Sequence, residues 1–342
     1  MTAAPRRSAL LASAIAVSVA AIVAGCSSPT VPSPTVTAPS PSTSAANQDA
    51  TGGLFVDPDT AAARQVQQWR AEGRGADADL LQKIAGQPQP DWLTKPTGEV
   101  EDEARNYVEK AKAAGKRPYF VTYHIPGRDC DSYSGGGADG GDDYREWSGE
   151  VADAVRGSNA LIIVEPDGVP QTISCGKGES RLDLIADSVK QLKDAGATVY
   201  LDAGNPGFID DTGQLIDALK RSGVDRADGF SLNVSNFRTN EDNIAFGKEL
   251  SGALGGKHFV IDTGRNGNGG VDGDINGGPG WCNPPGRALG NPPTFRTGEP
   301  LVDAYLWVKR VGESDGDCRP GQPRAGQWMP EYALELAKNA KS

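Results

Sequence analysis

The sequence predicts an α/β fold on a parallel sheet, because short apolar runs alternate with amphipathic helical segments along most of the chain. Six runs rich in β-branched or aromatic residues are expected strands: 118–125, 160–164, 198–201, 229–234, 258–261 and 304–308. Helices are expected before and between them, at 59–70, 99–115, 143–156, 180–195, 214–221 and 241–250. Six parallel strands joined by crossover helices indicate a closed or nearly closed barrel.

Two details support these elements. The helix at 180–195 has one clear apolar face, formed by Leu182, Ile185, Ala186, Val189 and Leu192, and the helix at 99–115 ends at its glycine. Polar clusters follow the strands on their carboxyl side: 126–129, 165–167, 202–205, 233–236, 262–268 and 309–315. A single aspartate at a strand end is most often a cap or turn former. Several together at one rim of a barrel instead predict an active site.

The N-terminus has the pattern of an export signal. Arg6 and Arg7 precede an uncharged run at 8–24, and Val23-Ala24-Gly25-Cys26 resembles the bacterial lipobox, in which the cysteine is lipidated. The apolar run is shorter than the ~20 residues of a membrane span. We therefore expect a lipoprotein signal peptide at 1–25, a Ser/Thr/Pro-rich spacer at 26–51 and one catalytic domain at 52–342. The protein would lie on the outer face of the cell membrane, or be secreted if Cys26 is not lipidated.

Charge and cysteine content narrow the possible partners. The net charge of −11 argues against nucleic acid. With Cys26 assigned to lipid, four cysteines remain, and four allow three pairings. None lies in a CxxC pair that would indicate zinc, so disulfides are expected after export. We adopt the sequential pairing provisionally, Cys130 with Cys175 and Cys282 with Cys318.

The inventory of reactive side chains favours carboxylates. The two histidines, His124 and His258, lie in or beside apolar strands and are expected to be packed, and no GxSxG motif occurs. We therefore expect acid–base chemistry by paired carboxyl groups, with no metal or other cofactor. Trp69 and Trp147 lie in expected helices and should be core residues. Trp92 and Trp281 lie in Pro- and Gly-rich loops, where they could stack on sugar rings or anchor the loops.

The motifs at the strand ends resemble glycoside hydrolase family 6, the cellobiohydrolases and β-1,4-endoglucanases. The resemblance runs in order from about residue 54 to residue 340. It is carried by Tyr123-His-Ile-Pro-Gly-Arg-Asp-Cys130, Ile163-Val-Glu-Pro-Asp167, Tyr200-Leu-Asp-Ala-Gly204, Asn233-Val-Ser-Asn236, Asp262-Thr-Gly-Arg-Asn-Gly-Asn268, Trp281-Cys-Asn-Pro-Pro-Gly-Arg287, Leu306-Trp-Val-Lys309 and Gly312-Glu-Ser-Asp-Gly316.

The resemblance implies a distorted parallel β/α barrel of about seven strands, the sequential disulfide pairing, and hydrolysis of β-1,4-glucan with inversion. Asp167 matches the general acid, and Asp129 matches the aspartate that keeps this acid protonated. Two neighbouring carboxyl groups raise one pKa at the expense of the other, as an acid working near neutrality requires. Asp315 matches the candidate base, which would act on a water directly or through a second one.

The same resemblance implies roles for other residues. Tyr123 matches the residue that crowds the sugar ring at the cleavage point, and Ser134 falls in a loop that helps to hold the water. Further substrate contacts are implied for Trp92, Asp202, Asn233, Trp281, Lys309 and Glu313. The expected partners are a β-1,4-glucan or cello-oligosaccharide and, through Cys26, the membrane; the protein should be a monomer.

One departure concerns the leaving-group side of the cleft. After Asp-Ala-Gly the family usually has His and then Trp, where this sequence has Asn205 and Phe208. Weaker binding there motivates an alternative, a cell-surface glycan-binding lipoprotein with weak or no turnover. The matched carboxylates favour an enzyme. The compact domain, with only a modest Gly-rich insertion at 269–280, favours an open, endoglucanase-like cleft.

Overall fold

A curled sheet of seven parallel strands forms the centre of the fold. The structure, a computed structural model, describes residues 50–341 except 177 and 179, and these belong to one compact unit that extends from Pro41 to Ser342. The expected signal peptide, the lipidation at Cys26 and nearly all of the spacer lie outside the described residues. The strand order is β1-β2-β3-β4-β5-β6-β9. The strands are β1 Asp91–Leu93, β2 Tyr119–Thr122, β3 Leu161–Val164, β4 Thr198–Asp202, β5 Gly229–Leu232, β6 His258–Asp262 and β9 Val302–Leu306.

The expected parallel barrel of about seven strands is confirmed as an open one, because β9 does not pair with β1. All six expected strands form, in places shorter than their apolar runs. The sequence missed β1, which pairs with β2 through Asp91–Leu93. Trp92 was expected in a loop and instead lies in this edge strand. The strand is only three residues long and lies among the five residues between Pro90 and Pro96, which is too short a run to recognise.

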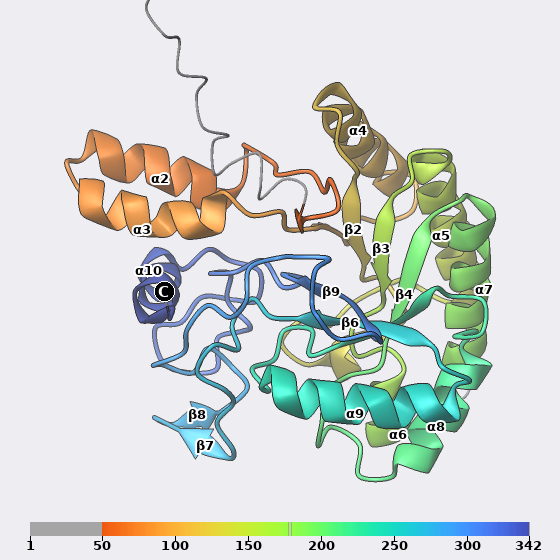
Figure 1. Ribbon diagram of the computed structural model, residues 1–342. Coiled ribbons are helices and arrows are strands. Elements are labelled where there is room, and N and C mark those ends of the chain that lie inside the picture. The colour runs from red at the N-terminus through yellow and green to blue at the C-terminus, as the bar shows by residue number, and fades with distance from the viewer. Residues whose placement is uncertain (1–49, 177, 179, 342) are drawn as a thin grey trace, which may run out of the picture. The chain divides into compact units, whose positions relative to one another are not determined.

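Helices surround the sheet (Figure 1). Those that cover its outer face are α4 Val100–Ala113, α5 Gly141–Val155, α7 Ser180–Asp194, α8 Thr212–Arg221 and α9 Asn240–Ala253, with the short α6 Pro170–Ser174 beside them. A separate group consists of α2 Ala61–Ala71, α3 Gly75–Ala85 and α10 Pro330–Asn339. The sequence predicted neither α3, α6 nor α10.

The two faces of the sheet pack into different cores. Alternate strand residues such as Phe120, Ile162 and Leu201 point outward and pack against the helices. Their neighbours, such as Val121 and Ile163, point inward and fill the barrel. This alternation follows from the two-residue period of a strand, and burial of both faces explains why the strands read as continuous apolar runs.

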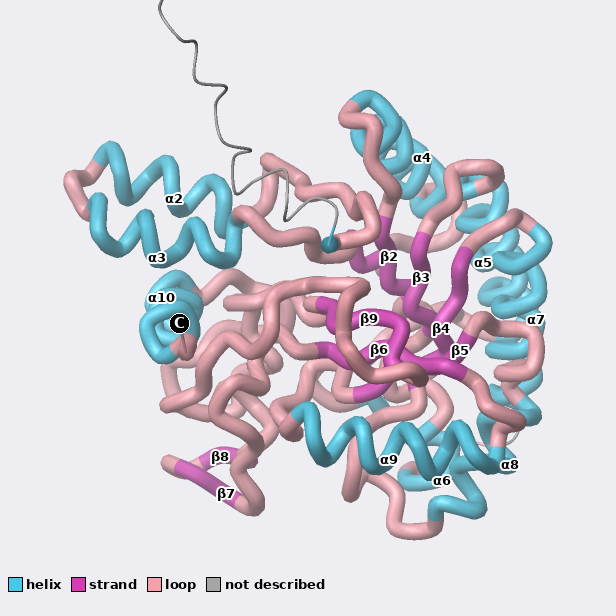
Figure 2. Tube along the Cα trace, viewed as in Figure 1, coloured by secondary structure: helices cyan, strands magenta, loops and turns pink. Residues whose placement is uncertain are grey.

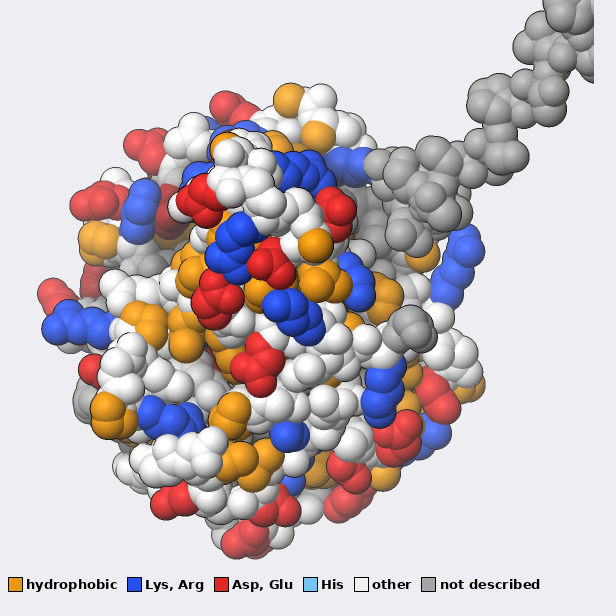
Figure 3. All heavy atoms as spheres, turned by 90° about the vertical axis from the view of Figure 1, so that its left-hand side faces the viewer, with side chains coloured by type: hydrophobic (Ala, Val, Ile, Leu, Met, Phe, Trp, Pro, Cys, Tyr) orange, Lys and Arg blue, Asp and Glu red, His pale blue; other side chains and the backbone are white. Residues whose placement is uncertain are grey.

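The helices α2, α3 and α10 enclose a smaller core of their own. Trp69 lies in it, packed with residues such as Leu81 and Leu336, and is buried as expected. On the outside, Arg74 pairs with Asp77 at 2.8 Å and with Glu331 of α10 at 3.0 Å. Figure 3 shows this side of the molecule, where acidic and basic side chains are interspersed and no acidic patch dominates.

The segment between β6 and β9 is mostly loop (Figure 2). It contains only the short hairpin β7 Asp274–Ile275 and β8 Gly278–Pro279. Both expected disulfides are present, Cys130–Cys175 and Cys282–Cys318. They fasten the longest loops at the carboxyl end of the sheet. Within the described residues, no helix has the length and apolar character needed to cross a bilayer.

Candidate active site

A cleft of about 530 Å³ lies at the carboxyl ends of the strands. Ten of the residues singled out from the sequence line it: Trp92, Tyr123, Asp129, Ser134, Asp167, Asn205, Phe208, Trp281, Lys309 and Asp315. Trp92 comes from β1, and the others come from loops that follow most of the strands of the sheet. Parallel strands bring their carboxyl ends to one rim, which explains why residues so distant in sequence meet.

Asp129 is held at the end of the loop that follows β2. Its φ of +54° is uncommon for a residue other than glycine. The backbone N–H of Ser134 donates to Asp129 Oδ2 at 2.7 Å, and Arg128 lies 5.0 Å from the ring centroid of Tyr123. Burial raises the pKa of Asp129, while the hydrogen bonds to its carboxylate act in the opposite direction. The loop therefore presents a carboxylate in a fixed orientation.

Glu165 fastens this loop to β3. Its carboxylate is fully buried and accepts from the backbone N–H of His124 at 3.0 Å, from that of Ile125 at 3.0 Å and from the Tyr144 hydroxyl at 3.0 Å. Burial raises its pKa, and these bonds lower it. Glu165 also has a positive φ of +47°. Local strain of this kind persists only where the surroundings fix it, and here it places Asp167 two residues further on.

Asp167 has the environment of a carboxyl group that keeps its proton. Burial raises its pKa well above the usual range, and the charges on Asp202 and Asp129 raise it further. Its φ is +65°, and its backbone N–H donates to Asp202 Oδ2 at 2.9 Å. No described group forms a hydrogen bond with the Asp167 side chain. The carboxyl group is thus directed into the cleft with its proton available.

Asp202 and Asn233 were expected to line the site, but both are fully buried beneath it. Asp202 accepts from the backbone of Asp167 and Gly204 and from the Ser231 hydroxyl. Burial raises its pKa to about 7. Asn233 donates to the Asp262 carbonyl at 2.8 Å. Both side chains form hydrogen bonds with backbone groups beneath the cleft.

Asp315 lies across the cleft in a cationic setting. Its Oδ2 accepts from Arg265 at 2.7 Å and from the backbone N–H of Asn283 at 3.0 Å. Lys309 Nζ lies 3.7 Å from the other oxygen, Oδ1. In the described part of the chain, Oδ1 is buried and accepts no hydrogen bond. One oxygen anchors the carboxylate and the other can receive a proton.

Aromatic side chains form part of the walls. Trp92 donates from Nε1 to the Val308 carbonyl at 2.9 Å and meets Tyr123 edge to face, with 5.2 Å between ring centroids. Trp281 is 46% exposed and lies 5.8 Å from the ring of Tyr133. A half-exposed indole that lines a cleft offers an apolar face to a flat ligand.

The two departures from the family pattern, Asn205 and Phe208, both line the cleft. Asn205 is 8% exposed, and its side chain has no hydrogen-bond partner among the described residues. Phe208 packs over Gly204, where an added Cβ would lie 2.9 Å from its ring. Arg238 and Asp272, which also line the cleft, form an ion pair of 2.8 Å.

Glu313 is not among the residues that line the cleft. It lies in a separate small pocket, where it faces Arg310 at 3.7 Å. Lys309 does line the cleft, and burial lowers its pKa. Both residues were expected to contact substrate, and the structure places Lys309 in the cleft and Glu313 in the separate pocket.

Sequence reasoning missed Gln171, Arg238 and Arg265. Arg265 lies inside the quoted Asp262–Asn268 motif, so its position beside a strand end could have indicated it. It is 1% exposed and pairs with Asp315. Gln171 follows Asp167 by one helical turn, a spacing that could have indicated a neighbour of the acid.

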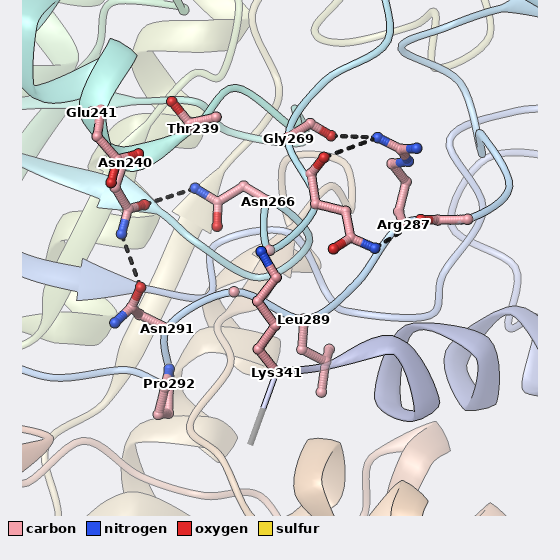
Figure 4. Close-up of a pocket in the computed structure, with 14 residues that line it drawn as sticks. Thr239, Asn240, Glu241, Asn266, Gly269, Arg287, Leu289, Asn291, Pro292 and Lys341 are labelled. Atoms are coloured by element: carbon pink, nitrogen blue, oxygen red, sulfur yellow. Dashed lines mark hydrogen bonds between the residues drawn. The ribbon is translucent and has the colours of Figure 1, made fainter.

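A second, larger pocket of about 750 Å³ is lined in part by residues 266–269 (Figure 4). Amide side chains dominate it: Asn266 donates to Asn240, which donates to Asn291. Its described lining contains one carboxylate, Glu241, and no aromatic ring. Of these two pockets, the first cleft combines several carboxyl groups with aromatic rings, and it is therefore the candidate active site.

The fold is an open β/α barrel, and its strand ends bring three carboxyl groups to one cleft with aromatic walls. These features define a class of proteins equipped for acid–base chemistry on a sugar polymer. Comparison with known proteins gives the family. Residues 49–340 match the model of the glycosyl hydrolases family 6. The chain belongs to this family.

Two curated relatives are endoglucanases A. The protein of Cellulomonas fimi is 44% identical over 294 residues, which cover 85% of this chain and 62% of that protein. The protein of Thermobispora bispora is 37% identical over 296 residues, 84% of this chain and 62% of that protein. The chain thus spans about three fifths of the length of these relatives.

A solved structure gives a similar result. The endoglucanase Cel6 from Mycobacterium tuberculosis, in complex with methyl-cellobiosyl-4-deoxy-4-thio-β-D-cellobioside, matches with a TM-score of 0.77 and 42% identity. The match covers 84% of this chain and 96% of that chain. The likeness therefore includes nearly all of that neighbour.

Proposed function

We propose that the protein hydrolyses β-1,4-glucosidic bonds in cellulose or a related β-glucan, with inversion at the anomeric carbon. The observation that carries this proposal is the pKa of Asp167, which burial and two neighbouring aspartates raise within a cleft that also holds Asp129 and Asp315. A raised pKa keeps a proton on the acid near neutrality.

Asp167 donates its proton to the glycosidic oxygen as the bond to the anomeric carbon breaks. Asp129 remains ionised, which holds the proton on Asp167 and stabilises positive charge that develops on the sugar ring. Tyr123, buried between Trp92 and Arg128, crowds the ring and favours its distortion. The half-exposed Trp281 supplies a stacking surface for a neighbouring glucosyl unit.

Asp315 acts as the base for the attacking water. Its Oδ1 is the oxygen that can accept the proton, since Oδ2 is bonded to Arg265 and Asn283. Inverting enzymes place water between acid and base, typically with roughly 6.5–9.5 Å between the carboxyl groups. The proton passes to this oxygen from the attacking water directly or through a second water, and the loop that contains Ser134 would help to hold that water.

Internal cleavage is the favoured mode of action. Four relatives of at least 35% identity carry the name endoglucanase. The short insertion at 269–280 forms only the β7–β8 hairpin, which is small for a loop that closes a tunnel.

Export also belongs to this proposal. The signal-like N-terminus and the two disulfides support an oxidising compartment. Lipidation at Cys26 would then tether the protein, as a monomer, to the outer face of the membrane.

Incubation with a soluble cellulose derivative tests the proposal. New reducing ends, a rapid fall in viscosity and an α-configured first product by NMR are expected. Binding without new reducing ends at any pH would instead support the glycan-binding alternative. A β-configured first product would refute inversion.

A further inference from the structure

Gln171 is a buried polar residue of the cleft to which the mechanism above gives no role. It lies in α6, is 6% exposed, and lines the cleft together with Asp129 and Asp167. Its Nε2 donates to Asp129 Oδ1 at 3.4 Å. Its Oε1 is buried and has no hydrogen-bond partner among the described residues. A buried amide with an unused acceptor in a cleft requires a reason.

The short helix α6 connects Gln171 to both aspartates. The backbone N–H of Gln171 donates to the Asp167 carbonyl at 2.9 Å, and that of Cys175 donates to the Gln171 carbonyl at 3.0 Å. Cys175 forms the disulfide with Cys130, the residue directly after Asp129. Backbone bonds therefore fix Gln171 relative to Asp167, and the disulfide holds the Asp129 loop against the same helix.

The chemistry of an amide suits this position. An N–H donor favours the ionised form of Asp129, and its hydrogen bond is one of the effects that lower the pKa of this carboxyl group against burial. A cation in the same place would lower the pKa of Asp129 and also that of Asp167. A neutral donor acts on the carboxylate that it touches and leaves the neighbouring acid protonated.

The other charged groups around the pair act differently. Arg128, on the same loop as Asp129, lowers its pKa, and Tyr123 is a neutral phenol. Asp202 below Asp167 raises the pKa of the acid, and Arg181 from α7 lowers it. Two uncharged donors contact Asp129: the backbone N–H of Ser134 at Oδ2 and the side-chain amide of Gln171 at Oδ1. Of these two, Gln171 is the side chain.

We propose that Gln171 is a positioning residue that keeps Asp129 ionised and oriented beside the protonated Asp167. Its unused Oε1 accepts a hydrogen bond from a hydroxyl group of the bound glucan or from a water in the cleft. This inference rests on the proposed function, because it assigns Asp129 and Asp167 the roles described there.

Two variants and a matched control test it by the pH dependence of kcat/KM on cellopentaose. Gln171→Met keeps the side-chain volume and removes the hydrogen-bond donor, so the pKa of Asp129 rises. The acidic limb of the pH profile of kcat/KM then moves to higher pH by roughly half to one unit. Because Asp129 then loses charge, the alkaline limb of Asp167 moves down. Gln171→Glu adds a negative charge beside the pair, which moves both limbs up. The kcat/KM at the optimum should fall about tenfold in Gln171→Met.

Gln191→Met is the control. Gln191 lies on α7, donates at 3.3 Å to the Arg145 carbonyl and also has a buried Oε1 without a partner, but it lies outside the cleft. Its substitution should leave both limbs unchanged. If Gln171→Met loses activity with wild-type limbs, the residue is only structural and the inference is wrong.

Thermal unfolding shows whether each variant folds. If Gln171→Met does not fold, Gln171→Glu is the test, since it preserves the shape of the side chain. A pH profile of kcat/KM in Gln171→Glu that equals the wild-type profile would overturn the inference. Failure of the proposed function looks different, because the wild-type protein would then release no products from cellopentaose.

Discussion

Replacement of Asp167 by asparagine is the most direct test of the acid. The substitution keeps the shape of the side chain and the backbone bond to Asp202, but removes the proton donor. On a natural glucan, the leaving sugar then departs as an unprotonated alkoxide. Turnover of cellulose derivatives should therefore fall steeply.

The structure indicates that the loss of turnover should be large, because no second proton donor is at hand in the described part of the cleft. Tyr123 cannot replace the acid, since burial and then the charge of Asp167 raise its pKa well above the ordinary value. Asp202 is fully buried beneath the cleft and cannot reach the glycosidic oxygen. With no second donor, we expect kcat to fall about 10³-fold, which corresponds to about 4 kcal/mol of transition-state stabilisation.

The assay compares two substrates. With 2,4-dinitrophenyl β-cellobioside the leaving group needs no proton, so Asp167→Asn should lose less than about tenfold. Asp217→Asn, an exposed aspartate on α8, is the control and should match wild type on both substrates. Unchanged turnover of carboxymethyl-cellulose by Asp167→Asn would refute the assignment. Equal losses on both substrates would show that the variant has lost substrate positioning.

Three further predictions follow from the site. Asp202→Asn removes a charge that raises the pKa of Asp167, so the alkaline limb of kcat/KM should move down by roughly one pH unit. In wild type, the free energy of unfolding should also fall as pH rises from 4 to 7, because the folded pKa of Asp202, about 7, exceeds its ordinary 3.8. In Asp202→Asn, the free energy of unfolding should depend less on pH over this range. Arg265→Met removes the nearer cation of a buried carboxylate, with Lys309 left at 3.7 Å, and should cost about 3–5 kcal/mol in urea unfolding. Arg145→Met, which breaks two exposed pairs, with Asp142 and Asp187, should cost under about 1 kcal/mol. Trp281→Ala removes a stacking surface, so KM should rise about tenfold with kcat nearly unchanged, and an unchanged KM would contradict that role.

Much of the fold could be predicted because its signals are local. Each of the six long apolar runs became a strand, and the amphipathic helices formed within a few residues of their expected bounds. The elements that were missed have weak local signals. The strand β1 has only three residues, and α10 follows a loop rich in glycine and proline. Their stability comes from packing against other elements.

Some residues of the site could be predicted from the sequence and others could not. Asp129, Asp167 and Asp315 follow strand ends, and the parallel sheet brings them to one cleft. The same strand-end position did not distinguish Asp202, which turns its carboxylate toward backbone N–H groups beneath the cleft. Glu313 lies two residues before Asp315, yet the loop between them directs it into another pocket.

The sequence alone determined the class of fold, the carboxyl chemistry and the family, because periodicity and motif order are properties of neighbouring residues. Only the tertiary structure decided which surroundings raise the pKa of Asp167, the residue that the resemblance had matched to the acid. Burial, the charges of Asp202 and Asp129, and the amide of Gln171 act on Asp167 and its partner from separate strands and helices. A pKa depends on distances through space, and those distances exist only once the strands are assembled into one sheet.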